Sequence, residues 1–333
     1  MSVCTWPVGP VGFARLFMAV TARVVYNGVG GGIERVSKYM MPVLLVLVSL
    51  IAGYSLTLRR VDESGNLRTG LQGLLYYITP NFKGLTVGRF LQILLDAMSQ
   101  LFFSLSVSMG IMITYGSYVK PEVDLNHAVN QIEVFDTGVA LIAGAMIIPA
   151  VYVFTGTEGM SAGPSLMFVS LPKVFHAMGR AGVAVGLCFF VTTIFATLTS
   201  CVSVLESIVA NCMEIFHTGR KKTVLNLTII YLALSAVVAL GYSLFYFELP
   251  LPNGSVGQLL DLMDYISNSV MMPFIALLST ILIGWVMTPD EIIDEMERGG
   301  RTFRRKKLYV VMIRYVTPVM MLVLFLTSTG IIK

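Results

Sequence analysis

Three serines alternate within a long apolar run, where a lipid environment tolerates few polar groups. Ser104, Ser106 and Ser108 stand in the stretch Gln100–Gly110 of this 333-residue chain. Residues two apart do not share a face of a regular helix, so these hydroxyls line one site only if the helix unwinds there. Unwinding exposes backbone carbonyls and two helix ends, which suit a small cation and a charged substrate. The alternative is that each serine bonds to its own helix or packs against a neighbouring helix.

A second group of hydroxyls lies in the middle of another apolar run. Thr199 and Ser203 are four residues apart, as are Ala196 and Ser200, so each pair shares one helix face. Hydroxyl oxygens at these positions can complete the shell of a sodium ion. The alternative is that the small residues serve close packing between helices.

Acidic residues inside apolar runs form a third candidate group. Asp136 begins one such run, Asp264 lies near the outer end of another, and Glu206 lies in the inner half of a third. A buried carboxylate is costly unless it is paired or binds an ion. For Asp136 and Asp264 the alternative is a solvated acid at the membrane surface.

No enzymatic motif competes with a binding role for these residues. His127, His176 and His217 are scattered and make no HExxH pair. An intramembrane hydrolase that uses a buried serine would lack the base and the oxyanion donors. The net charge of +4 comes from basic residues in short loops, a pattern that predicts membrane topology. We therefore expect neither an enzyme nor a nucleic-acid partner.

The composition predicts a chain whose solvent is the lipid bilayer. Hydrophobic residues make up 56% and charged residues 13%, against about 25% charged in ordinary soluble domains. A membrane-spanning helix needs about 20 mostly apolar residues. Seven runs meet this need and predict an all-α, polytopic transmembrane bundle: Met40–Leu58, Phe90–Tyr118, Phe135–Phe154, Ala181–Phe216, Val224–Phe247, Leu259–Met287 and Leu308–Ile331. An eighth run, Phe13–Tyr26, is interrupted by arginine and is predicted to be a partial span.

The basic loops predict which side of the membrane each loop faces. Arg220–Lys222 and Arg298–Lys307 lie on the same side if the spans alternate, and both should face the cytoplasm. The loop Glu248–Ser255 between them has no Lys or Arg and should face outward. Ser165–Met178 is predicted to be a short helix that dips back against the protein from an outer loop.

These motifs together resemble the neurotransmitter:sodium symporter family in its bacterial branch. The stretch Phe102–Ser106 with Met109–Tyr118 resembles the unwound sixth helix of that family, and Leu198–Glu206 resembles its eighth helix. Further segments resemble the entry to the fifth helix, the re-entrant outer loop and the eleventh helix: Gly31–Lys38 with Met41–Pro42, Gly163–Pro164 with Phe168–Pro172, and Arg314–Pro318.

The resemblance implies a transporter fold of two inverted five-helix repeats. Residues 16–333 are expected to hold family helices four (in part) to eleven, with the second repeat at about residues 88–288. Residues 1–15 do not resemble the family and are expected to be an atypical N-terminal segment. The first three helices of the family are expected to be missing, so the chain is interpreted as N-terminally truncated.

The resemblance also implies roles for individual residues. The wall of the substrate pocket is expected to comprise Phe103, Ser104, Ser106, Met109, Ser200 and Val204. One sodium site is expected to use Ala196, Thr199 and Ser200, and the other Ser104 and Asp136. Asp264 matches the acidic half of the outer gate, and Gln100 matches a position beside chloride or its carboxylate substitute.

Two residues depart from the family pattern. The family usually has glycine where Ser108 stands, and often an aromatic residue where Met109 stands. A serine in place of glycine fills space and is expected to narrow the pocket.

The expected function is sodium-coupled symport of an amino acid or a related small amine across the plasma membrane. Sodium is the expected coupling ion, and chloride use and a homodimer stay open. The alternative is an inactive truncated fragment with at most an interaction role, because half of an ion shell leaves costly unpaired groups.

Overall fold

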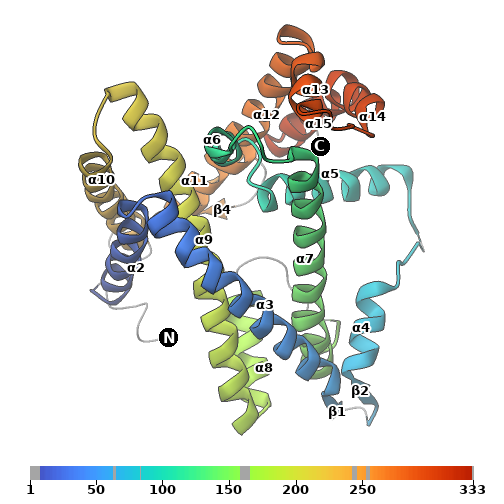
Figure 1. The fold of residues 1–333 in the computed structure, drawn as a ribbon. Helices are drawn as coiled ribbons and strands as arrows, with labels where there is room; N and C mark the ends of the chain where they lie inside the picture. Colours follow the sequence, from blue (N-terminus) through green and yellow to red (C-terminus); the bar gives the residue numbers. More distant parts are fainter. Residues whose placement is uncertain are drawn as a thin grey trace. The chain divides into compact units, whose positions relative to one another are not determined.

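The computed structural model describes residues 8–62, 65–82, 84–157, 166–241, 246–252 and 256–331 (Figure 1). The described part is helical apart from two short antiparallel hairpins. Within it, six helices are long and apolar enough to cross a membrane: Val29–Thr57, Leu125–Thr155, Arg180–Phe216, Arg220–Leu240, Leu259–Val286 and Lys306–Ser328. The all-α, polytopic architecture predicted from the composition is confirmed.

Contacts between residues divide the chain into two compact units, which are described separately. The first unit comprises residues 1–28, 86–130 and 202–333, and the second comprises residues 29–85 and 131–201. Helices α7 (Leu125–Thr155) and α9 (Arg180–Phe216) contribute residues to both units.

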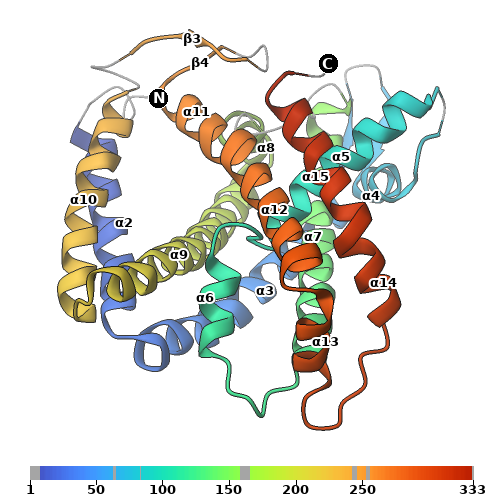
Figure 2. The same cartoon turned by 90° about the horizontal axis from the view of Figure 1, so that it is seen from above.

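Two helices of the first unit lie side by side, as Figures 1 and 2 show. These are α2 (Val8–Tyr26) and α10 (Arg220–Leu240). The C-terminal end of α2 meets the N-terminal end of α10, so the pair is antiparallel. The unit also contains α5, α6, the hairpin strands and a short acidic helix: α5 (Val87–Ser104), α6 (Ile111–Tyr118), β3 (Leu249–Pro250), β4 (Val256–Gly257) and α13 (Pro289–Glu297).

Two long helices of the first unit are interrupted by π-helical turns. One consists of α11 (Leu259–Asp264), η4 (Tyr265–Met271), α12 (Met272–Ile281) and η5 (Leu282–Val286). The other consists of α14 (Lys306–Val311), η6 (Met312–Val316) and α15 (Thr317–Ser328). Pro273 and Pro318 stand at the second residue of α12 and of α15. The wider turns η4 and η6 thus lie directly before a proline, which has no N–H to donate.

Arg301, in the segment after α13, links that segment to the loop after α6. Its guanidinium donates hydrogen bonds to the carbonyl oxygens of Glu122 and Val123, at 2.6 and 2.7 Å. Its Nε lies 3.8 Å from a carboxylate oxygen of Asp124. These contacts fix the point at which the chain leaves the C-terminal end of α6.

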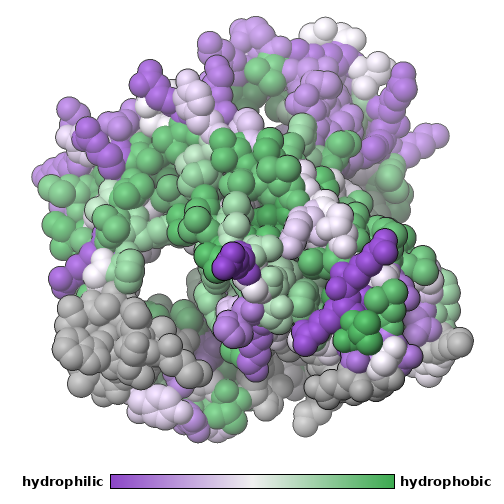
Figure 3. Space-filling view, turned by 90° about the horizontal axis from the view of Figure 1, so that it is seen from below, coloured by the Kyte–Doolittle hydropathy of each residue, from purple (hydrophilic) through white to green (hydrophobic). Residues whose placement is uncertain are grey.

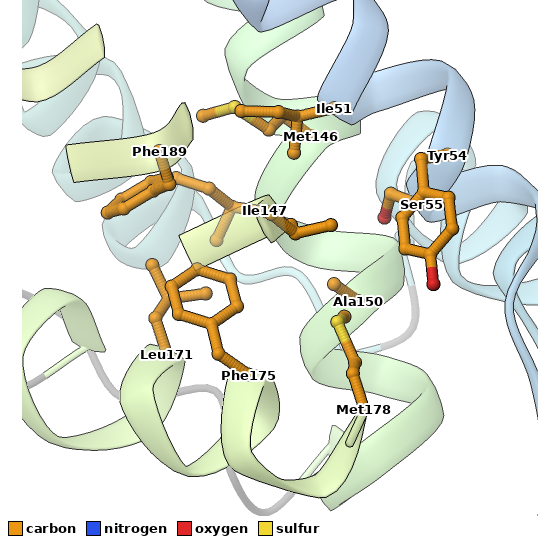
Figure 4. A pocket seen from close by; sticks show the side chains of 11 residues that line it. Ile51, Tyr54, Ser55, Met146, Ile147, Ala150, Leu171, Phe175, Met178 and Phe189 are labelled. Carbon is orange, nitrogen blue, oxygen red and sulfur yellow. The ribbon is translucent and has the colours of Figure 1, made fainter. Parts of the chain in front are cut away.

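The second unit is built around a buried cluster of aliphatic and aromatic side chains. It contains η1 (Val29–Ile33), α3 (Glu34–Thr57), η3 (Leu166–Ser170), α8 (Leu171–Ala177) and its parts of α7 and α9. The rings of Phe175 and Phe189 lie 5.5 Å apart between centroids. Figure 4 shows these rings with Met146 and Leu171 around a cavity of about 10 Å³. A cavity of this size is close to the smallest that holds a water molecule, so the cluster is nearly close-packed.

The segment between the predicted spans Met40–Leu58 and Phe90–Tyr118 contains regular structure. It forms the hairpin β1 (Arg59–Val61) and β2 (Leu67–Thr69), followed by α4 (Gly70–Ile78). A capping box begins α4, because Thr69 accepts from the N–H of Gln72 and Gln72 accepts from the N–H of Thr69.

The predicted spans agree with the helices in position but differ at several ends. α3 and α7 begin earlier than predicted, and α10 ends at Leu240, before the predicted end at Phe247. The run Phe13–Tyr26, predicted to be a partial span, lies within one continuous 19-residue helix. The predicted short helix Ser165–Met178 is present from Leu166 to Ala177 as η3 and α8, whereas Gly163, Pro164 and Ser165 lie outside the described residues.

Large apolar side chains remain exposed on the surface, as a lipid solvent allows. Val87 and Ile113 are each 78% exposed, and Figure 3 shows hydrophobic residues spread over much of one face. In water such an area would favour aggregation or a partner. In a bilayer it is the surface that faces lipid.

We expect Gly73→Ala to destabilise the second unit by about 1–3 kcal/mol, because overpacking a close contact displaces backbone. A Cβ at Gly73 would lie 2.6 Å from the Cα of Pro149 on α7, so α4 and α7 would have to separate. The measurement is the thermal unfolding midpoint of the purified protein in detergent. Gly53→Ala is the matched control, since nothing lies within 4 Å of its Cβ. It should leave the midpoint unchanged or raise it. Equal effects of the two substitutions would contradict the packing argument.

Candidate functional site

The predicted interruption of the serine-bearing run is present. α5 ends at Ser104 and α6 begins at Ile111. Between them, Ser106, Ser108 and Gly110 have positive φ angles of 52°, 68° and 76°. Three alternate residues in the left-handed region turn the chain out of the helical path. The interpretation of the alternating serines as an unwound stretch is therefore confirmed.

Gly110 is the last residue of the break. Neither its backbone conformation nor its surroundings suit a residue with a larger side chain. Its φ of 76° lies in the region that glycine adopts at little cost. A Cβ there would lie 3.1 Å from the Oγ of Ser207 on α9. The backbone at the start of α6 thus lies directly against the second half of α9. The first N–H groups of α6 face the break, and they carry a partial positive charge.

We expect Ser108→Gly to stabilise the protein by up to about 1 kcal/mol. A residue with a Cβ costs roughly 1–2 kcal/mol in the left-handed region, which exceeds the roughly 0.5–1 kcal/mol that the extra freedom of glycine adds to the unfolded chain. Ser108→Ala is the control, because it removes the hydroxyl and keeps the Cβ. Thermal unfolding in detergent measures both. A gain with alanine equal to that with glycine would show that the hydroxyl, and not the backbone, is the source of strain.

Five of the predicted site residues lie along this one segment. Gln100, Phe103 and Ser104 occupy the last turn of α5 and are exposed. Ser106 and Met109 lie within the break and are half-buried. The α5–α6 group of predicted residues thus lies along one short stretch, with hydroxyls, an aromatic ring and a thioether at the end of α5 and in the break.

A second group of predicted residues lies on consecutive turns of α9. The carbonyl oxygen of Ala196 accepts from the hydroxyl of Thr199 at 2.9 Å and from that of Ser200 at 3.1 Å. Each hydroxyl donates its single proton in a hydrogen bond to its own helix, so the lone pairs of its oxygen remain able to coordinate a cation. Val204 follows Ser200 by one turn. The structure places Ala196, Thr199 and Ser200 in the second unit and Val204 in the first.

Of the two predicted acidic site residues, Asp264 lies near the end of its long helix, as expected, whereas Asp136 does not lie at the start of its helix. Asp136 was predicted to begin its span, but α7 begins at Leu125. The carboxylate is therefore about 16 Å along the helix from its start. Asp264 is the last residue of α11, at the junction with η4, and remains exposed. Its Oδ1 accepts from the side-chain amide of Asn268 at 2.6 Å.

A polar seam joins α6 to the second half of α9. The hydroxyl of Tyr115 donates to Ser203 Oγ at 2.8 Å, and that of Thr114 donates to Ser207 Oγ at 3.2 Å. The hydroxyl of Tyr118 donates to Glu206 Oε1 at 2.8 Å. Along each helix the bonded residues recur at spacings of three and four, so they lie on one face of that helix.

Glu206 has no solvent exposure and is neutralised by Arg220. Arg220 Nη1 donates to Glu206 Oε1 at 3.0 Å, and Nη2 donates to Oε2. The same guanidinium donates from Nε and Nη2 to the carbonyl oxygen of Val25, at 3.0 and 2.8 Å. Val25 lies in the last turn of α2, where carbonyl groups attract cations. One guanidinium thus connects α9, α10 and α2.

Sequence reasoning identified Glu206 as a buried acid but missed its partners. The sequence indicates Arg220 only as part of a basic loop that predicts membrane topology. Its place in the first turn of α10 brings it back to α9 across the tight connection at residues 217–219. Tyr115 and Tyr118 were noted only as part of a motif. A spacing signal was present, because Tyr115 and Tyr118 are three apart and Ser203 and Glu206 are three apart.

We expect Arg220→Ala to destabilise the protein by about 3 kcal/mol or more, because it leaves a buried carboxylate without its counter-charge. Unfolding in detergent, followed by circular dichroism, measures the change. Lys222→Ala, two residues on and exposed, is the control and should shift stability by less than about 0.5 kcal/mol. Adding Glu206→Gln to Arg220→Ala should restore part of the loss. A double variant less stable than Arg220→Ala would exclude the unpaired carboxylate as the cause.

Comparison with known proteins gives a consistent result over nearly the whole chain. The model of the sodium:neurotransmitter symporter family matches residues 9–333. An uncharacterized sodium-dependent transporter of Bacillus subtilis (strain 168) is 31% identical over 335 residues, which cover 100% of this chain and 69% of that protein. An uncharacterized sodium-dependent transporter of Haemophilus influenzae is 30% identical over 319 residues, which cover 95% of this chain and 65% of that protein.

A solved structure is similar as well. The crystal structure of MhsT in complex with L-phenylalanine matches with a TM-score of 0.80 and 34% sequence identity. The match covers 98% of this chain and 70% of the MhsT chain. This chain therefore spans about two thirds of the length of these three proteins.

Proposed function

This chain is a member of the sodium:neurotransmitter symporter family, and we propose that the protein couples sodium entry to the uptake of an amino acid or a related small amine. The observation that carries the proposal is the break between α5 and α6, with positive φ at Ser106, Ser108 and Gly110. Interrupted membrane helices are the places where transporters of this architecture bind substrate and ions. The family consists of membrane transporters, and the chain is a multi-pass membrane protein.

We infer that the substrate contacts the break through backbone and hydroxyl groups. The N-terminal end of α6 is suited to a substrate carboxylate, since its N–H groups are partly positive. The proposed wall of the pocket comprises Phe103, Ser104, Ser106, Met109, Ser200 and Val204. Met109 and Val204 favour a substrate with an apolar side chain. The L-phenylalanine bound to MhsT supports an amino acid as the substrate class.

Sodium is proposed to bind at oxygen atoms of the same elements. One site uses the carbonyl of Ala196 and the hydroxyls of Thr199 and Ser200, which are already arranged around one helical turn. The other uses Ser104 and Asp136. Neutral and anionic oxygens are the donor set that a small hard cation prefers. The names of the bacterial relatives support sodium dependence.

The transport cycle is proposed to follow from movement about these sites. Ions and substrate bind near the membrane midplane, and the protein then rocks to open the site inward. Asp264 is proposed to belong to the outer gate, and Gln100 to lie beside the anion position. The seam of Tyr118, Glu206 and Arg220 is proposed to hold α6 against α9 on the cytoplasmic side while the site faces outward.

We infer that this chain has the domain organisation that its resemblance to the family implies. Residues 16–333 would form the bulk of the transporter domain, with the second repeat at about residues 88–288; since the family model already matches from residue 9, at most residues 1–8 of the segment 1–15 would lie outside it.

We expect Ser200→Ala to raise the sodium concentration for half-maximal uptake by about tenfold or more. A lost ligand to a charged group costs roughly 1.5–3 kcal/mol, and 1.4 kcal/mol is a factor of ten. Proteoliposomes with the full-length protein and an imposed sodium gradient measure uptake of radiolabelled amino acids. Thr197→Ala is the matched control. Its hydroxyl is exposed on the same helix, bonds to Thr193 O at 2.8 Å and is not a proposed ligand.

Uptake that ignores sodium would overturn the proposed coupling. An equal effect of the two alanine variants would overturn the assignment of Ser200. The chain on its own can be tested by scintillation proximity binding of the same amino acids. Saturable, sodium-dependent binding there would exclude the alternative that the chain is an inactive fragment.

A further inference from the structure

A groove runs between α2 and α10 in the first unit, along the pair seen in Figure 2. Its volume is about 290 Å³. On α2 it is lined by Ala19, Ala22 and Tyr26, and on α10 by Leu225 and Thr228. The two alanines leave the space that larger side chains would fill between these antiparallel helices.

The groove has a basic end and an apolar end. At the basic end, Arg23 lines the groove, and Lys221 Nζ lies 5.7 Å from the centre of the Tyr26 ring. This cation–π contact holds the ammonium at the groove mouth. At the other end lie Ala19 and Thr228, about 10 Å further along the helices. The hydroxyl of Thr228 donates to Val224 O at 2.6 Å and so offers no free proton.

The basic end faces the cytoplasmic surface of the membrane. Arg220 at the start of α10 bonds to Val25 O at the end of α2, so both ends lie at one level. The loop before Arg220 is the one that its basic residues place in the cytoplasm. The basic side chains of the groove thus lie at the membrane surface, where lipid headgroups are, and the apolar part of the groove points toward the bilayer centre.

No acidic residue belongs to either helix to balance this charge. The described residues Val8–Tyr26 and Arg220–Leu240 include Arg15, Arg23, Arg220, Lys221 and Lys222 and no Asp or Glu. Arg220 is neutralised by Glu206, whereas Arg23 lines the groove and Lys221 lies over the ring of Tyr26, which also lines it.

We propose that this groove binds one anionic phospholipid of the cytoplasmic leaflet, with its phosphate between Arg23 and Lys221 and an acyl chain along Ala19 and Ala22. The polarity of the groove matches that of a phospholipid from headgroup to chain. A second copy of the chain fits less well. A two-fold contact would place the same basic residues opposite each other, where like charges repel.

The test is native mass spectrometry of the purified chain, released from micelles that contain phosphatidylglycerol or phosphatidylcholine with identical acyl chains. We expect one retained phosphatidylglycerol, bound at least fivefold more tightly than phosphatidylcholine. The double variant Arg23→Gln, Lys221→Gln should reduce phosphatidylglycerol binding to the phosphatidylcholine level, since each basic residue near an anionic headgroup contributes about a factor of five. Arg15→Gln is the matched control, because Arg15 is an exposed arginine of the same helix that does not line the groove.

A third variant, Ala22→Leu, keeps every charge and fills the groove, and Ala19→Leu does the same if Ala22→Leu does not fold. Loss of the lipid with either leucine variant supports a seated acyl chain. Four outcomes would overturn the proposal: Arg15→Gln lowers binding as much as the double variant, the double variant binds phosphatidylglycerol as tightly as before, soluble glycerol phosphate displaces the lipid, or the species retained is a dimer of the chain.

Discussion

A buried carboxylate must be compensated by other groups of the protein, and Glu206 sets this requirement where α2, α6, α9 and α10 meet in the first unit. Arg220 supplies the counter-charge and Tyr118 a further hydrogen bond. Because the guanidinium also bonds to Val25, compensation of one charge fixes the ends of α2 and α10 against α9. The position of α6 depends on the same group through Tyr118. Charge burial in this chain thus determines which helix ends meet.

Much of the fold could be predicted because lipid imposes simple rules on sequence. Apolar runs of sufficient length indicated the long helices, and the alternating serines indicated the break, because a regular helix cannot place residues two apart on one face. The residues on α9 were also in register, since spacings of three and four brought Ala196, Thr199 and Ser200 onto neighbouring turns.

The rest depended on contacts that a single sequence does not reveal. The partner of Glu206 is only 14 residues away, yet nothing in the sequence distinguishes Arg220 from the other basic loop residues. The helix α4 was missed because its nine residues are too short to span a membrane. The start of α7 was placed too late, since its first turns are polar and the prediction relied on apolar residues. Asp136 therefore lies deeper along its helix than expected.

The long helix α9 has a mechanical consequence. Its second half, from Val202 to Phe216, contains neither proline nor glycine, so this part offers no hinge along about 21 Å. Ser203 and Glu206 are three residues apart, which places them about 5 Å apart along the axis and about 60° apart around it. A rotation of this half about its own axis that turns Ser203 turns Glu206 by the same angle. The torsional stiffness of one helix is thus sufficient to make the hydrogen bonds of Tyr115 and Tyr118 break or form together.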